Sequence, residues 1–227
     1  MAQLDQPILP PLLYRYRPLS NDTIDREIAA IDEQYIWLSN YRELNDPMEG
    51  FYEPSGRLQK ENNYTEAARQ LLSAKKQIGI CSFSDTHENE LMWTHYATNY
   101  AGICVAYRPI PLIKGLPDDT HLARLTYGNT PPKIDNSEAT NLDKAATKIL
   151  SHKKSNWVYE REWRVLGPRG RLNIESKGCA RAVYLGSRIA PSHKDRIMME
   201  LAQVHVSIHE MRVSDYGHIW TKIKNLK

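Results

Sequence analysis

The sequence has little cysteine, no long apolar run and almost no excess charge, and each shortage excludes a class of protein. Its three cysteines are far apart and form no Cys-x-x-Cys pair, which argues against a disulfide framework or a structural zinc site and suits a reducing cytosol. No stretch approaches the ~20 apolar residues of a membrane span, and residues 1–11 lack the basic start and apolar core of a signal peptide. We therefore expect a cytoplasmic protein without a membrane partner.

The charges nearly balance: 30 basic and 27 acidic residues leave a formal net charge of +3. This excess is too small to imply a nucleic acid or an anionic membrane by itself. Hydrophobic residues make up 41% and charged residues 25% of the 227 residues, which is typical of globular proteins. We expect a single domain over residues 1–227, with residues 1–11 as an extended arm because prolines 7, 10 and 11 disfavour regular structure.

Helical and strand patterns are mixed along the chain without a regular βαβ alternation, which favours an α+β fold with mainly antiparallel sheets and peripheral helices. Asn21 and Asp22 are the expected cap-region residues of the first helix, whose buried face is Ile24, Ile28 and Ile31. We expect strands at about residues 12–17, 35–39, 78–84, 102–107, 122–127, 157–166, 182–185 and 205–213, and helices at about residues 24–31, 64–76, 88–98, 137–153 and 191–203.

The expected strand 157–166 is the most informative segment, because side chains alternate between the two faces of a strand. Alternation places Glu160, Glu162 and Arg164 on one face, so two carboxylates are neighbours. Like charges at this spacing raise each other's pKa and are costly to bury. They indicate either a site that carries chemistry or a solvated ladder of ion pairs on an exposed edge.

The first expected strand carries a similar pair of charges. Arg15 and Arg17 share a face with Leu13. Two guanidinium groups in mid-strand suit a groove that binds phosphate or carboxylate. The alternative is an edge strand that positive charge protects from pairing with other chains.

Three short motifs, in order, resemble the ADP-ribosyltransferases of the pertussis- and cholera-toxin type. Tyr14-Arg15-Tyr16 is similar to the aromatic-Arg pair on their first strand. Ser39 ends a strand after the first helix, and Glu160-Arg161-Glu162 supplies the Glu-x-Glu of a late strand. The toxins usually carry Ser-Thr-Ser where this chain has Trp37-Leu38-Ser39. The resemblance implies a split β-sheet core and NAD as the substrate.

Nearly the whole chain also resembles the bacterial domain-of-unknown-function family 2971, a name that fixes no activity. The matching stretches are Leu13-Tyr14-Arg15-Tyr16-Arg17, Leu44-Asn45-Asp46-Pro47-Met48-Glu49-Gly50, Cys81-Ser82-Phe83-Ser84, Leu91-Met92-Trp93-Thr94-His95-Tyr96, Gly102-Ile103-Cys104 and Trp157-Val158-Tyr159-Glu160-Arg161-Glu162-Trp163-Arg164.

The resemblance to the transferases assigns roles to individual residues. Glu162 would hold the ribose hydroxyl and stabilise the positive charge that develops on the ribose as the nicotinamide bond breaks. Glu160 would orient or deprotonate the acceptor. Ser39 would hold Glu162, while Arg15, together with Arg17, would grip a phosphate of the dinucleotide.

Aromatic side chains are the candidates for stacking on nicotinamide. Tyr41, Trp93 and Tyr96 are the rings in question, and His95 would line the same site. Ordinary packing, or a hydrogen-bonded structural histidine, is the alternative for each of them.

Three hypotheses follow. The first is an NAD-dependent mono-ADP-ribosyltransferase or NAD glycohydrolase without a bound metal. It would serve as a toxin or in phage defence, and its acceptor would be a protein or a nucleic acid. Its partner would be an antitoxin or the product of a neighbouring gene. The second is a metal-dependent nuclease with Asp46, Glu160 and Glu162 as ligands, although Asp46 and Glu49 also suit the shaping of a turn. The third is a non-enzymatic binding module.

Overall fold

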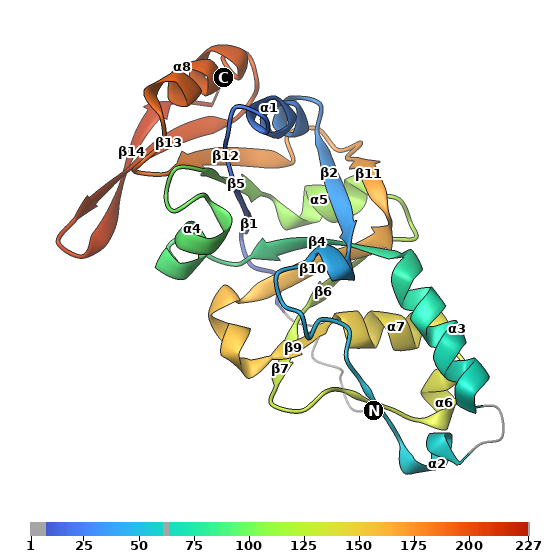
Figure 1. Cartoon of the computed structure of the whole chain (residues 1–227). Helices are drawn as coiled ribbons and strands as arrows, with labels where there is room; N and C mark the ends of the chain where they lie inside the picture. The colour runs from blue at the N-terminus through green and yellow to red at the C-terminus, as the bar shows by residue number, and fades with distance from the viewer. Residues whose placement is uncertain (1–7, 61–63, 227) are drawn as a thin grey trace. The chain divides into compact units, whose positions relative to one another are not determined.

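The computed structural model describes residues 8–60 and 64–226 (Figure 1). Its described residues fall into two compact units. Unit 1 contains residues up to 36, residues 83–116 and residues from 173 onward, and unit 2 contains residues 37–82 and 117–172. Both units mix helices and strands, and most of the strand pairs of the chain are antiparallel, which confirms the α+β prediction. Most of the expected arm at residues 1–11 lies outside the described residues.

Unit 1 is organised around a buried central strand. β5 pairs antiparallel with β1 and with β12, β12 pairs parallel with β13, and β13 forms an antiparallel hairpin with β14. Every residue of β5 is buried, as its unbroken apolar run predicts for a strand covered on both faces. The strands are β1 (Leu13–Arg17), β5 (Ile103–Tyr107), β12 (Ala180–Leu185), β13 (Ser207–Ser214) and β14 (Gly217–Lys224).

The helices of unit 1 are α1 (Ile24–Asp32), α4 (Glu90–Tyr96), α5 (Pro109–Gly115) and α8 (Pro191–Glu200). The apolar face of α1 is confirmed, because Ile24, Ile28 and Ile31 are buried. Asn21 and Asp22 directly precede the N-cap residue Thr23, as expected of cap-region residues. The Thr23 hydroxyl makes no capping hydrogen bond and accepts from the Ser20 amide instead.

Strands β2 (Tyr35–Asn40) and β4 (Ile78–Ser84) pass from one unit to the other. Within unit 2 they pair antiparallel, β4 also pairs with β10 (Glu162–Pro168), and β10 pairs antiparallel with β6 (His121–Arg124). The remaining strands are β3 (Glu53–Pro54) with its parallel partner β8 (Lys133–Ile134), β7 (Thr126–Gly128) with its parallel partner β9 (His152–Lys154), and β11 (Gly170–Asn173).

Helices α3 and α7 lie side by side in unit 2 (Figure 1) and enclose an apolar core that includes Leu71, Ile134 and Ile149. The expected single helix over residues 137–153 is wrong. It is interrupted where the Asn141 side chain accepts from the Lys144 amide and starts a new helix. The helical segments are η1 (Tyr41–Glu43), α2 (Gly56–Gln59), α3 (Tyr64–Gln77), α6 (Asn136–Ala139), α7 (Leu142–Leu150) and η2 (Ser155–Glu160).

The expected strand over residues 157–166 is wrong in its first half. The segment up to Glu160 is the 3₁₀ helix η2, Arg161 adopts a left-handed conformation with φ 48°, and β10 begins at Glu162. Glu160 and Glu162 are therefore not neighbours on one strand face. At the other end of the chain, β14 was not predicted, because the turn that leads into it has Asp215 and Tyr216 at positive φ where Asn-Gly is the usual signal.

None of the helices in the described part of the chain has the length and apolarity that crossing a membrane requires.

Candidate functional site

Glu160 and Glu162 are brought together in unit 2 by one lysine. The Lys153 ammonium donates to Glu160 Oε2 at 2.5 Å and to Glu162 Oε2 at 3.1 Å. All three side chains are buried. The alternative of a solvated ladder of ion pairs is therefore wrong: these are buried charges, which require partners.

Arg164 extends this cluster to a distant loop. Its guanidinium group donates to Glu162 through Nε at 2.7 Å, and to both carboxylate oxygens of Glu49 at 2.7 and 3.0 Å. It also donates to the Leu150 carbonyl at 2.7 Å. Arg164 is fully buried, so this planar, bidentate arrangement replaces the hydration that the guanidinium group has lost. We call Glu49, Lys153, Glu160, Glu162 and Arg164 the ion-pair network.

Local backbone structure explains how the two glutamates reach the same lysine. The left-handed turn at Arg161 separates the end of η2 from the start of β10, so the side chains of Glu160 and Glu162 approach Lys153 from two different elements. Lys153 lies in β9, opposite Tyr127 of β7. The Tyr127 hydroxyl accepts a hydrogen bond of 2.8 Å from the Glu162 amide, which fixes the first residue of β10.

The carboxylate of Glu162 has its acceptor sites filled. It accepts from Arg164 Nε at 2.7 Å, from Arg164 Nη2 at 3.1 Å, from Lys153 at 3.1 Å and from the Ser82 hydroxyl. Two carboxylate oxygens offer about four lone-pair sites. A ribose hydroxyl would bind Glu162 only if one of these donors left. Ser82 makes the contact that the resemblance assigned to Ser39, which lies opposite Ile80 on β4.

Contacts within the network shift the pKa values of two of its members, Glu162 and Lys153. Burial would raise the pKa of Glu162, but the charges of Arg164 and Lys153 and the hydrogen bonds from Arg164 and Ser82 outweigh it and lower the pKa to about 2. Burial would lower the pKa of Lys153, but the carboxylates of Glu162 and Glu160 outweigh it and raise the pKa. The network thus joins two cations, Lys153 and Arg164, to three carboxylates.

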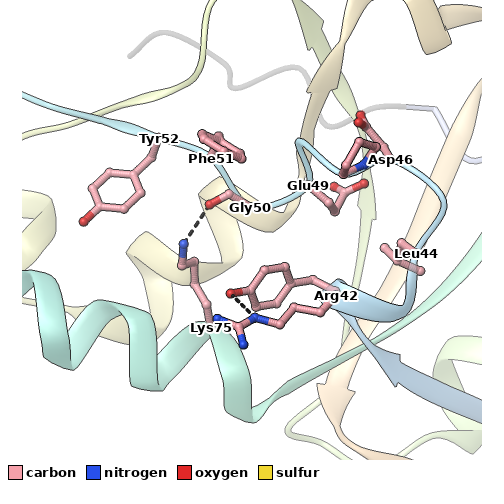
Figure 2. A pocket seen from close by; sticks show the side chains of 10 residues that line it. Arg42, Leu44, Asp46, Glu49, Gly50, Phe51, Tyr52 and Lys75 are labelled. Atoms are coloured by element: carbon pink, nitrogen blue, oxygen red, sulfur yellow. Dashed lines mark hydrogen bonds between the residues drawn. The ribbon is translucent and has the colours of Figure 1, made fainter.

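Three cavities of unit 2 surround the loop that contains Glu49, and Asp46 lines all three. The first, of about 420 Å³, is also lined by Arg42, Lys75 and Tyr52 (Figure 2). A second, of about 290 Å³, is lined by members of the network and by cationic and apolar side chains. Its lining includes Met48, Glu49, Phe51, His152, Lys153 and Lys154. A third, of about 260 Å³, is lined by Met48, Lys154, Asn156, Trp157 and Tyr159.

The loop is shaped by the residues that line these cavities. Asp46 Oδ1 accepts from the Met48 amide at 2.9 Å, which confirms the expected turn-forming role. Glu49 is held by Arg164, while the Phe51 side chain is exposed at 62% and lines the first two cavities. A rigid loop with two carboxylates and an exposed ring thus forms a shared wall.

The residues predicted from the sequence are divided between the two units. Ser39, Tyr41, Glu160 and Glu162 belong to unit 2. The five others, which are Arg15, Arg17, Trp93, His95 and Tyr96, belong to unit 1. Tyr41 is buried, lines the largest of the three cavities and packs against Lys75, whose ammonium is 5.5 Å from the ring centroid.

The arginines of β1 face the first helix of unit 1. Arg17 donates to both carboxylate oxygens of Glu27, at 2.5 and 2.6 Å. The charge of Arg15 also helps to lower the pKa of Glu27, although burial opposes it and Arg17 contributes more. Part of the positive charge of β1 is thus matched by a buried acid of α1.

The aromatic candidates of α4 have different surroundings. Trp93 is fully buried and donates to the His87 carbonyl at 2.7 Å, as expected for a packing residue. His95 is exposed and lies edge-on to Tyr96.

Sequence reasoning singled out Glu160, Glu162 and Arg164 but missed the lysine that joins the two glutamates. Lys153 lies in the basic run His152-Lys153-Lys154, nine positions before Glu162, and such runs are usually solvated surface. Ser82 and Tyr127 are single polar residues farther from Glu162 in the chain and gave no signal. Glu49 was noted only as a loop residue, and Asp46 as a loop residue or a metal ligand. Within the described residues, 8–60 and 64–226, no group of three or more His, Cys, Asp or Glu side chains is arranged to hold a metal ion.

The fold and the site define an α+β protein with a buried ion-pair network beside several cavities. Residues 92–165 match the family model described as "Protein of unknown function (DUF2971)". This match supports the family resemblance over residues 92–165, a segment that includes Lys153, Glu160, Glu162 and Arg164. A search of curated proteins and a search of solved structures gave no match.

Proposed function

We propose that this protein binds NAD in the cavities of unit 2 and cleaves the bond between nicotinamide and ribose, with water or an acceptor taking the ADP-ribose. The observation that carries the proposal is Asp46, a carboxylate that lines all three cavities next to a buried network of three carboxylates and two cations.

The charge distribution suits this chemistry. Departure of nicotinamide leaves positive charge on the ribose, and fixed negative charge in a site of low polarity stabilises it. Asp46 and Glu49 are the carboxylates in the cavity walls, and Arg164 holds Glu49 in place. Glu162 acts through Arg164, as a positioning residue whose low pKa keeps it ionised.

The other groups around the loop suit a nucleotide. Phe51 offers an exposed ring for stacking, and Lys154 and His152 are cations or donors in the second cavity. This proposal includes three further parts. Arg15 binds a phosphate, the acceptor is a protein or a nucleic acid, and the protein serves as a toxin or in phage defence.

The proposal is tested by incubating the purified chain with NAD labelled in the ADP-ribose part and measuring nicotinamide release and label transfer. Asp46→Asn and Glu49→Gln should each lower the rate by about a hundredfold or more, as loss of an electrostatic stabiliser does. Glu53→Gln is the matched control, because Glu53 is exposed and lines none of the three cavities. Equal rates in Asp46→Asn, Glu49→Gln and the control would exclude this site.

A second candidate function is nucleotide binding without cleavage. The observation that favours it is the filled set of acceptor sites on Glu162, which is typical of a structural ion pair. In that case calorimetry would show NAD binding to the wild type while nicotinamide release stays at the rate without protein. Release above that rate would exclude it.

A further inference from the structure

The largest of the three cavities contains a buried cation that pairs with no carboxylate of residues 8–60 and 64–226. Lys75, in α3, is buried, and its ammonium donates to the Gly50 carbonyl at 2.7 Å (Figure 2). An ammonium group has three donors. Its other close neighbours are the rings of Tyr52 and Tyr41, whose centroids are 5.0 and 5.5 Å away. No ion pair joins Lys75 to a carboxylate within the described residues.

A second cation lines the same cavity. Arg42 is exposed, and its Nε lies 3.4 Å from the Tyr41 hydroxyl. Burial lowers the pKa of Lys75, and the nearby charge of Arg42 lowers it further. Two like charges thus line one cavity, and burial of the Lys75 ammonium costs free energy unless a negative group joins it.

The acidic residues of the cavity do not fill this role. Both oxygens of Glu49 are engaged by Arg164, and Asp46 Oδ1 accepts from the Met48 amide. Figure 2 shows Asp46 on the side of the cavity away from Lys75.

We propose that Lys75 and Arg42 form a binding site for the oxyanion of a small molecule, whose ring packs against Tyr52 and Phe51. The geometry suits a phosphate monoester such as a mononucleotide, because phosphate presents several acceptors to the free donors of an ammonium and a guanidinium group. A carboxylate shares this chemistry and is the other possible source of the oxyanion. The inference does not depend on NAD cleavage.

The test is calorimetric titration of the full chain with inorganic phosphate, AMP and benzoate. The wild type should bind AMP more tightly than phosphate, because the ring adds contacts. Binding of benzoate alone would identify a carboxylate site, which the shared chemistry allows. Lys75→Met and Arg42→Gln should each weaken binding by about tenfold or more, as expected when a charge-assisted hydrogen bond is lost.

Lys76→Met is the matched control, since it removes the same charge from an adjacent, exposed position that does not line the cavity. A second measurement uses only the wild type and so does not depend on the folding of a variant. AMP should protect Lys75, but not Lys76, from an amine-acylating reagent. The proposal is overturned if the wild type binds none of the three ligands at about 10 mM. Equal affinity in wild type and Lys75→Met, or unprotected Lys75, would overturn it too.

Discussion

Arg164 of β10 holds both carboxylate oxygens of Glu49, a residue 115 positions earlier in the chain, at 2.7 and 3.0 Å. Both side chains are buried, so neither charge has bulk water as an alternative partner. The loop that carries Glu49 is therefore anchored to the sheet of unit 2 by charge, and the cavity wall depends on this anchor.

The first prediction concerns this anchor. Arg164→Met removes the cation and leaves Glu49, Glu162 and the Leu150 carbonyl without their donor. Breaking a buried pair from one side typically costs about 3–5 kcal/mol, and chemical denaturation should show a loss of this size in the free energy of unfolding. Arg124→Met is the control: Arg124 is exposed on the adjacent β6, and its loss should cost less than about 0.5 kcal/mol.

The second prediction concerns pH. The folded pKa of Glu162, about 2, lies below its ordinary value of 4.5, so the network stabilises the fold above pH 4.5. This contribution is lost as the pH falls from 4.5 toward 2, because the unfolded chain then binds a proton at this carboxyl group while Arg164 and Lys153 keep the folded one ionised. The free energy of unfolding should fall more steeply in this window for the wild type than for Glu162→Gln. Parallel pH profiles would show that Glu162 is not held ionised.

The third prediction concerns Arg17, which was expected to bind a cofactor. Because its guanidinium group is bonded to Glu27, Arg17→Gln and Glu27→Gln should each destabilise the chain, by about 1–3 kcal/mol. The double variant should cost much less than the sum of the two single changes. Additive losses would show that the pair is not coupled in solution.

The fourth prediction concerns Glu88 in unit 1, which accepts from Trp220 Nε1 at 2.8 Å and faces His218 Nδ1 at 3.3 Å. Glu88→Ala removes this acceptor, so the indole N–H of Trp220 should exchange with solvent faster in NMR spectra. The cost in stability should be about 1 kcal/mol, since the carboxylate is half exposed. An unchanged exchange rate would mean that the strand β14 alone protects the indole.

The sequence alone predicts those elements in which the local pattern of apolar residues matches the buried face. The apolar run of β5 and the spacing of Ile24, Ile28 and Ile31 in α1 each point to a buried face, and each lies where it was expected. Such elements follow from composition and period alone.

The site could not be predicted in the same way, because it depends on contacts between distant residues. The alternating aromatic residues before Glu160 have strand propensity, yet the segment is helical and ends in the left-handed Arg161. Nothing in the pattern shows that Lys153 meets both glutamates or that Arg164 reaches Glu49. Whether Arg15 approaches the same ligand as the network stays a prediction.

The two units are assembled from alternating stretches of chain, and the boundary is crossed near residues 36, 82, 116 and 172. No contiguous fragment therefore contains all of unit 2 without also containing residues 83–116 of unit 1. Isolating unit 2 would require a gene that joins its two stretches directly, whereas point substitutions keep the chain whole.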